Sequence, residues 1–165
     1  MENITRFVSL DLSTTKSGIA YWENGEYKES YVIDHDKHGD IDKRTDLMGK
    51  DIICALNYFK PSIVYTEDSF DGKNPKTMKY LSRLHGIAQG WCYINNSEHN
   101  LIMPSEWRQY IPGFPNGKGE KRDIQKAYAV KYVTENYGFV PLTDDQADAI
   151  LIGEGIIRMF DEFDA

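Results

Sequence analysis

The alternation of apolar and polar residues in the first part of the chain predicts three β-strands. Residues 6–13 are an apolar run that ends in polar residues, and residues 17–22 are a second run of this kind. Asn24 and Gly25 follow, and this dipeptide is typical of a two-residue hairpin turn because both positions accept a positive φ. Residues 27–33 are again rich in β-forming side chains. We therefore expect three antiparallel strands.

A different spacing begins after this segment. Apolar side chains recur at helical intervals over residues 43–59, and Pro61 ends that helix. The other expected elements, in chain order, are a buried strand at 62–68, a helix at 73–93, a brief strand at 101–103, one or two helical turns at 104–111, a loop at 112–119, and helices at about 120–137 and 143–160.

This order of elements predicts the fold class. Three antiparallel strands followed by strands that alternate with helices give an α/β fold, with a mixed five-stranded central sheet and helices on both faces. A chain of 165 residues has the size of one domain, and it contains no internal repeat. We expect residues 1–165 to form a single domain.

The composition argues against a membrane or secreted protein. No apolar run approaches the roughly 18 residues that a membrane span requires. The chain opens on an acidic segment rather than on the basic and then apolar pattern of a signal peptide. Cys54 and Cys92 each lie within a helical pattern and lack CxxC spacing, so we interpret both as core thiols in a reducing compartment. We expect a cytoplasmic protein.

The net charge of −7 argues against a nucleic-acid partner until its distribution is considered. Residues 73–131 carry ten Lys or Arg and four Asp or Glu, whereas the flanking segments are both acidic. A basic middle segment can give one positive face to an acidic protein. The same distribution is compatible with an ordinary solvated surface.

Two acidic residues end predicted strands. Asp11 follows the apolar part of the first strand, and Glu67 lies at the carboxyl end of the fourth. The first and fourth strands are neighbours in a sheet of this kind, so both side chains could meet at one sheet end. Open α/β sheets bind their ligands at such ends.

Two further acidic residues lie near the start of the last helix. Asp145 and Asp148 are three residues apart and therefore share one helix face. Thr143 and Gln146 have the spacing of a capping box. Helix-dipole complementation is a sufficient explanation for Asp144, and it also applies to Asp145.

Asp148 needs another explanation. It lies beyond the first helical turn, and its neighbours along the chain are mostly apolar. A carboxylate in that setting requires a cation or a strong hydrogen-bond donor. If Asp11, Glu67, Asp145 and Asp148 converge, their repulsion calls for divalent metal, and oxygen ligands of this type suit magnesium or manganese. Two such ions can promote hydrolysis of a phosphodiester.

Three segments of the chain, residues 9–20, 65–70 and 145–150, resemble the RuvC family of Holliday-junction resolvases, especially its phage-type members. The first is similar to the family's first strand with a catalytic aspartate, here Asp11. The second resembles the fourth strand closed by a catalytic glutamate, here Glu67. The third resembles the paired aspartates of the last helix. Ribonuclease H itself carries its glutamate on the first helix, so the position of Glu67 favours the resolvase branch.

The resemblance implies a ribonuclease H-like fold and a crossover junction endodeoxyribonuclease. Such an enzyme hydrolyses phosphodiesters in four-way DNA junctions with Mg²⁺, for which Mn²⁺ substitutes. Paired symmetric nicks need two active sites, so the resemblance also implies a homodimer. Its setting would be the cytoplasm of a bacterium or of a phage-infected cell, with branched DNA as the partner.

The resemblance also assigns roles to residues outside the carboxylate set. Lys118 and Lys121 match the family's lysine segment that approaches the scissile phosphate, and Phe70 matches an aromatic that stacks on bases. A basic stripe on the helix after Glu67 is a candidate for tracking phosphates, and its residues are Lys73, Lys76, Lys79 and Arg83. A core position for Phe70 and a solvated face for the stripe are the plain alternatives. We interpret Trp107 as a packing residue.

The chain departs from the bacterial pattern in two places. Leu12 and Ser13 replace the Pro-Gly that usually follows the first aspartate, and the loop at 112–119 does not match closely. These differences bear on sequence preference and on helper proteins more than on the chemistry.

Three other functions fit parts of the sequence. The same fold could act on flaps, forks or RNA–DNA hybrids. Residues 11–15 resemble the phosphate-binding turn of actin-like kinases, but those enzymes need two such domains. A catalytically inactive nucleic-acid-binding module would be expected to have lost Asp148.

Overall fold

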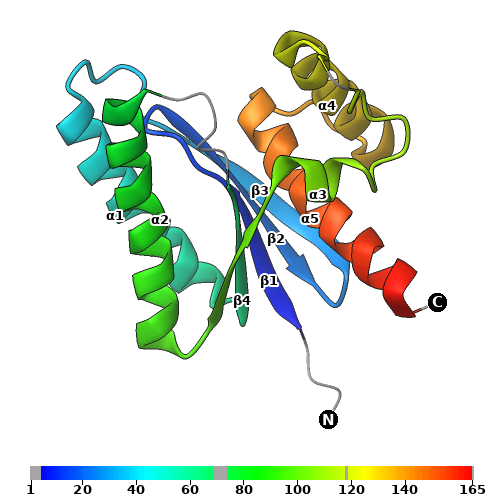
Figure 1. Ribbon diagram of the computed structural model, residues 1–165. Coiled ribbons are helices and arrows are strands. Elements are labelled where there is room, and N and C mark those ends of the chain that lie inside the picture. Colours follow the sequence, from blue (N-terminus) through cyan, green and yellow to red (C-terminus); the bar gives the residue numbers. More distant parts are fainter. Residues whose placement is uncertain (1–4, 69–73, 118, 165) are drawn as a thin grey trace.

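The computed structural model describes residues 5–68, 74–117 and 119–164 (Figure 1). One five-stranded sheet has the order β3-β2-β1-β4-β5. The strands are β1 (Arg6–Asp11), β2 (Lys16–Glu23), β3 (Glu26–Asp34), β4 (Ile63–Glu67) and β5 (Glu98–Ile102). The helices are α1 (Ile41–Phe59), α2 (Pro75–Asn95), α3 (Pro104–Arg108), α4 (Arg122–Tyr137) and α5 (Asp144–Asp164).

The pairing of the strands confirms the predicted mixed sheet. β1 pairs antiparallel with β2, and β2 pairs antiparallel with β3. β1 pairs in parallel with β4, and β4 pairs in parallel with β5. The hairpin between β2 and β3 turns at Asn24 and Gly25, whose φ angles of 53° and 78° are those of the expected turn. The first and fourth strands are neighbours, as the sequence predicted.

Helices cover both faces of the sheet (Figure 1). One face is packed by α1 and α2 and has a mainly aliphatic core, which includes Leu10, Ile52 and Leu84. The other face is packed by α3, α4 and α5. Its core contains more aromatic side chains, among them Trp22 and Trp107. We call these the α1/α2 face and the α5 face.

Three sequence-based expectations need correction. β5 begins at Glu98 rather than at residue 101, because pairing with β4 extends the strand into polar residues that lack a strand signal. α2 begins at Pro75, where the Asn74 side chain accepts a hydrogen bond from the Thr77 N–H. Cys92 is buried as expected, but Cys54 is exposed, because α1 directs Ile52 and Leu56 toward the core instead.

None of the helices in the described ranges is long and apolar enough to cross a membrane.

Candidate active site

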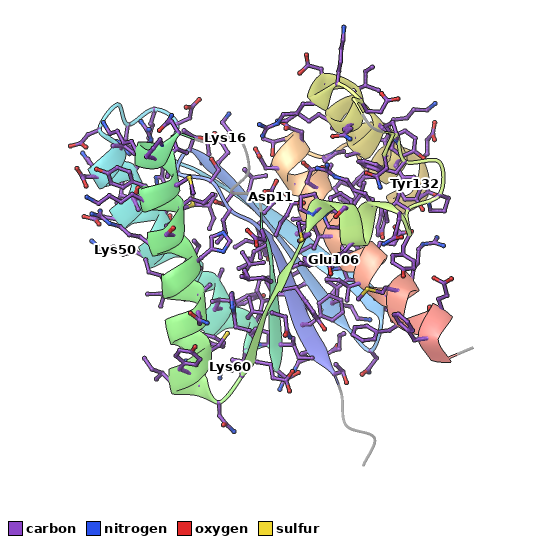
Figure 2. All side chains as sticks on the ribbon, viewed as in Figure 1. Asp11, Lys16, Lys50, Lys60, Glu106 and Tyr132 are labelled. Carbon is purple, nitrogen blue, oxygen red and sulfur yellow. The ribbon has the colours of Figure 1, made fainter. Side chains whose placement is uncertain are left out.

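The four carboxylates converge at the end of the sheet where β1 and β4 finish. Strand alternation puts Asp11 on the same side of β1 as Phe7, whose side chain belongs to the core of the α5 face. Figure 2 shows Asp11 beside the first turns of α5. Glu67 ends β4, and α5 supplies the two aspartates. All four, Asp11, Glu67, Asp145 and Asp148, line one cavity of about 460 Å³.

Gly18 allows the start of α5 to lie against the sheet. It is the antiparallel partner of Asp11 in the β1–β2 pairing. A Cβ atom at this position would lie 1.9 Å from the backbone oxygen of Asp145. Any side chain here would therefore collide with the α5 backbone. The absence of a side chain at Gly18 brings Asp145 toward Asp11.

The cap of α5 fixes the first turn of this helix. The N–H of Gln146 donates to Thr143 Oγ1 at 3.2 Å, as a capping box predicts. The Gln146 side chain instead accepts a hydrogen bond from the Leu142 N–H, and its amide group donates to Ser30 Oγ in β3 at 2.8 Å. α5 is thereby attached to the sheet at the end where its aspartates lie.

Burial and mutual repulsion disturb the ionisation of these groups. Burial raises the pKa of Asp11 well above its usual range, and the charges of Glu67, Asp148 and Asp145 raise it further. Burial, followed by the charge of Glu67, raises the pKa of Asp148 to about 7. Burial and then the charge of Asp144 raise the pKa of Asp145. The carboxylates are therefore close enough to repel one another.

Cationic side chains border the same cavity. They are Lys16, Arg108, Arg122 and Lys126. The charge of Arg108 lowers the pKa of Asp148, in opposition to burial. Lys126 forms an ion pair with Asp144. Sequence reasoning assigned none of these four cations to the site. Arg122 follows Lys121 in the lysine segment but fits a solvated helix start, and Arg108 and Lys126 are single basic residues in elements with no recognisable binding motif.

Trp107 holds one of the carboxylates. Its indole Nε1–H donates to Glu67 Oε2 at 2.7 Å, and both side chains are buried. The sequence had suggested a packing role for Trp107, and its complete burial agrees with that. The hydrogen bond to Glu67 is an additional role that sequence alone did not indicate.

The other predicted site residues lie in different places. Lys121 precedes α4 and is exposed, and its neighbours Glu120 and Arg122 line the cavity. The exposed residues Lys76, Lys79 and Arg83 lie on α2, which packs on the opposite face of the sheet from α5.

Arg83 in this stripe already pairs with Asp42 of α1, at 3.3 Å. Three predicted residues lie outside the described part of the chain: Phe70, Lys73 and Lys118.

The donor set fits a hard divalent cation. Carboxylate oxygens are the ligands that Mg²⁺ and Mn²⁺ prefer, and a cation would offset the burial and the mutual repulsion that raise the pKa values of Asp11 and Asp148. Within residues 5–68, 74–117 and 119–164, no three Asp, Glu, His or Cys side chains are already gathered closely enough to hold a metal ion. The carboxylates would therefore have to draw together around a cation.

Comparisons with known proteins point to one group of relatives. No protein-family model matches the chain. The crossover junction endodeoxyribonuclease RuvC of Fusobacterium nucleatum is 26% identical over 152 residues, which cover 89% of this chain and 77% of that protein. The enzyme of the same name from Caldanaerobacter subterraneus is 23% identical over 143 residues, covering 86% of this chain and 84% of that protein.

Solved structures establish the fold. The structure of Thermus thermophilus RuvC in complex with Holliday junction substrate superimposes with a TM-score of 0.72 at 13% identity, and 96% of each chain is covered. The yeast mitochondrial Holliday junction resolvase Ydc2 superimposes with a TM-score of 0.64 at 14% identity, covering 97% of this chain and 80% of that one. The chain is RuvC-like in sequence, and its fold is ribonuclease H-like, as predicted.

Proposed function

We propose that this protein is a metal-dependent, structure-selective DNA endonuclease that resolves four-way junctions by paired, symmetric hydrolysis of phosphodiesters. One observation carries the proposal. Asp11, Glu67, Asp145 and Asp148 come from three different elements, yet they line one cavity at the end of the sheet. The enzyme acts on DNA in the cytoplasm of a bacterium or of a phage-infected cell.

The carboxylates form the metal-binding part of the site. Asp11, Glu67, Asp145 and Asp148 hold Mg²⁺, and Mn²⁺ can replace it. When bound, the metal supplies positive charge at the phosphate and increases the acidity of water. The protein's own contribution is to keep four carboxylates at one edge of the sheet, where a cation offsets their mutual repulsion.

The cations at the cavity serve the phosphate of the DNA. Arg108 and Lys126 line the same cavity as the carboxylates. A phosphate bound at the metal would therefore also contact these two positive side chains. Burial alone would lower the pKa of Lys126, but the hydrogen bond and charge of Asp144 raise it overall. Lys126 therefore stays protonated at neutral pH and can stabilise negative charge on a phosphate oxygen.

The remaining predicted residues also contact the DNA, two of them at the bond that is cut. Lys118 and Lys121 approach the scissile phosphate from the segment before α4, where Lys121 acts as a catalytic residue by stabilising the developing charge, and Phe70 stacks on bases. Lys76, Lys79 and Arg83 contact phosphates along the outer side of the N-terminal half of α2, and Lys73, which precedes this helix in the sequence, has the same role. The exposure of Lys76 and Lys79 supports this role, because both ammonium groups can reach a bound duplex.

Two copies of the chain are needed for symmetric cleavage, and we place α2 in the contact between them. The outer side of its C-terminal half, beyond the basic residues, has open space at Gly86 and Gly90, where an added Cβ would meet no atom of the described residues within 4 Å. Two helices can approach closely at such positions. Tyr93 on α2 and Leu101 on β5 are exposed near this side and could be covered by a second copy.

The decisive experiment compares DNA cleavage by the wild-type protein and by carboxylate variants. Labelled four-way junctions, flaps, RNA–DNA hybrids and linear duplexes are incubated with Mg²⁺, Mn²⁺ or EDTA. We expect symmetric nicks in the junction that require metal. Asp11→Asn and Asp148→Asn should each lower the rate by about 10³-fold, because a lost metal ligand removes several kcal/mol of transition-state stabilisation.

The matched control is Asp161→Asn, which removes an exposed carboxylate from the same helix. It should cleave at the wild-type rate. Preferential cleavage of flaps or hybrids would support the proposed active site but contradict the four-way junction as its substrate. Binding of junctions without cleavage under any condition would contradict the enzyme proposal and favour a binding module.

A further inference from the structure

Trp107 differs from the other two tryptophans in what its indole N–H contacts. Trp22 donates to the hydroxyl of Ser9, and Trp91 donates to the side-chain oxygen of Asn57. Trp107 donates to Glu67 Oε2 at 2.7 Å. A short hydrogen bond from a buried, neutral donor to a carboxylate restricts the rotation of that carboxylate, and it adds no charge that would repel a cation.

The ring of Trp107 also supports a cation of the cavity. The guanidinium carbon of Arg108 lies 5.2 Å from the centre of the Trp107 ring and 5.6 Å from the centre of the Phe114 ring. Nη1 of Arg108 donates to Gln125 Oε1 at 3.3 Å. Two aromatic rings and one amide therefore hold the guanidinium at the cavity wall.

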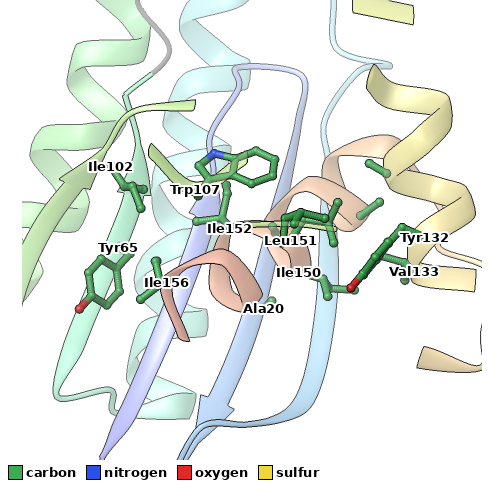
Figure 3. Packing of buried hydrophobic residues seen from close by; sticks show 14 of the residues in the cluster. Ala20, Tyr65, Ile102, Trp107, Tyr132, Val133, Ile150, Leu151, Ile152 and Ile156 are labelled. Carbon is green, nitrogen blue, oxygen red and sulfur yellow. The ribbon is translucent and has the colours of Figure 1, made fainter. Parts of the chain in front are cut away.

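Trp107 itself has little freedom to move. Its side chain is fully buried, and Figure 3 shows it packed beside Ile152 of α5. Gly155 of α5 lies so close that an added Cβ would be 2.7 Å from the backbone oxygen of Trp107. The indole is thus fixed to α5, the helix that carries Asp145 and Asp148, while its N–H reaches Glu67 on β4.

We propose that Trp107 is a positioning residue that fixes the Glu67 carboxylate for metal binding and supports Arg108 beside it. The inference rests on the proposed function, since it assigns a purpose to a contact within that site. The N–H and the ring have separate tasks. The N–H orients a metal ligand, and the ring face holds a phosphate-binding cation.

Replacing the indole nitrogen alone tests the first task. Site-specific incorporation of benzothienylalanine at position 107 keeps the size and ring of tryptophan and removes only the N–H. Trp107→Phe is a second variant that retains an aromatic ring. The same two changes at Trp22 are the matched controls, because Trp22 is also buried and also loses one indole hydrogen bond.

Two measurements separate positioning from general stability. The rise in melting temperature during a Mn²⁺ titration reports metal binding without any cleavage, and junction affinity in EDTA reports DNA binding without metal. We expect the position-107 isostere to need about tenfold more Mn²⁺ for half of the full rise, which is typical of a lost partner behind a metal ligand. Its junction affinity in EDTA should equal that of the wild type.

The two proposals fail in different ways. If the wild-type protein binds Mn²⁺ and the position-107 isostere needs the same concentration, the positioning role of Trp107 is wrong. If the Trp22 isostere shows the same tenfold change as the Trp107 isostere, the effect is general and the positioning role is also wrong. If the wild-type protein shows no metal-dependent rise and cuts no DNA, the proposed function itself is wrong.

Discussion

The two faces of the sheet are built in different ways. The α1/α2 face is packed mainly by aliphatic side chains such as Leu56 and Leu84. The α5 face contains buried polar groups that bond across elements. Ser9 Oγ, for example, donates to the Ala149 backbone oxygen at 2.7 Å. Tyr132 and Tyr137 donate to the two oxygens of Glu154.

Glycines show the same difference between the faces. On the α5 face, an added Cβ at Gly18 would collide with the α5 backbone. On the α1/α2 face, an added Cβ at Gly49 would meet the terminal methyl of Ile87 at 2.5 Å, and that side chain can move. Directional bonds and close backbone contacts position functional groups, whereas aliphatic packing mainly supplies stability. The α5 face therefore holds functional groups in place, and the α1/α2 face supports the sheet.

Adding one methyl group to each face should give the largest difference between the two faces. We expect Gly18→Ala to lower cleavage by about 100-fold or more, because α5 must shift and the aspartates move with it. Gly49→Ala should change stability by less than about 1 kcal/mol, because the Ile87 methyl can move aside and alanine favours the helix, and it should leave cleavage by the folded protein unchanged. Junction cleavage and urea unfolding of both variants test this. Equal loss of cleavage in the two variants would contradict it.

Removing a carboxylate from the α5 face should stabilise the metal-free protein. The folded-state pKa of Asp148 is about 7, above the usual value of 3.8. Ionisation of Asp148 therefore lowers the free energy of unfolding of the metal-free protein as the pH rises from about 4 to 7. In EDTA at pH 8, Asp148→Asn should therefore be more stable than wild type by roughly 1–2 kcal/mol. The difference should vanish at about pH 2–3, well below the unfolded-state pKa, where the folded and the unfolded wild-type protein both hold the proton.

Urea unfolding at several pH values measures this difference, and Asp161→Asn is the exposed control on the same helix. A metal-free Asp148→Asn protein that is less stable than wild type at pH 8 would mean that Asp148 is already satisfied without a cation. Added Mg²⁺ should stabilise the wild type and have little effect on the variant.

A small cavity in the α1/α2 face should change stability alone. Ile52 is fully buried, and Ile52→Val should lower the free energy of unfolding by about 0.5–1.5 kcal/mol. The Mg²⁺ concentration that gives half-maximal cleavage should stay the same, because no hydrogen bond on the α5 face is altered. A change in this metal requirement would show that the two faces are coupled.

The smallest expected effect concerns α2. Lys79 is exposed, and Lys79→Gln should weaken junction binding about twofold to threefold. The magnitude of the slope of log affinity against log salt concentration should fall by about one, because one phosphate contact is lost. Titrations of junction at several salt concentrations measure both quantities. Lys50→Gln on α1, which also lies on the α1/α2 face, is the control. An unchanged slope for Lys79→Gln would contradict a phosphate contact by Lys79.

The sequence predicted most of the fold because its strongest signals are local. Asn24 and Gly25 fixed the first hairpin through their φ preferences, and helical spacing identified the long helices. The neighbouring positions of β1 and β4 followed from the order of elements, so a common site for Asp11 and Glu67 could be predicted. The start of β5 could not, because its polar residues become a strand only through pairing.

The parts of the site that sequence missed depend on tertiary contacts. Arg108 lies in a five-residue helix with no pattern of its own, and only the aromatic rings around it show why it faces the cavity. In the sequence, Lys126 looks like an ordinary basic residue of an amphipathic helix. Its ion pair with Asp144, which marks it as part of the site, appears only in the structure. The hydrogen bond from Trp107 to Glu67 joins residues 40 positions apart, and no sequence pattern links the two residues.

The order of the site's elements along the chain has a consequence during synthesis. Asp11 and Glu67 lie on strands made early, whereas Asp145 and Asp148 lie on α5, which follows all five strands. A nascent chain that has completed its sheet on the ribosome still has only two of the four carboxylates. Domains begin to fold from their N-terminal parts during translation, so on the proposed assignment of the four carboxylates a chain can cut DNA only after α5 has emerged and docked.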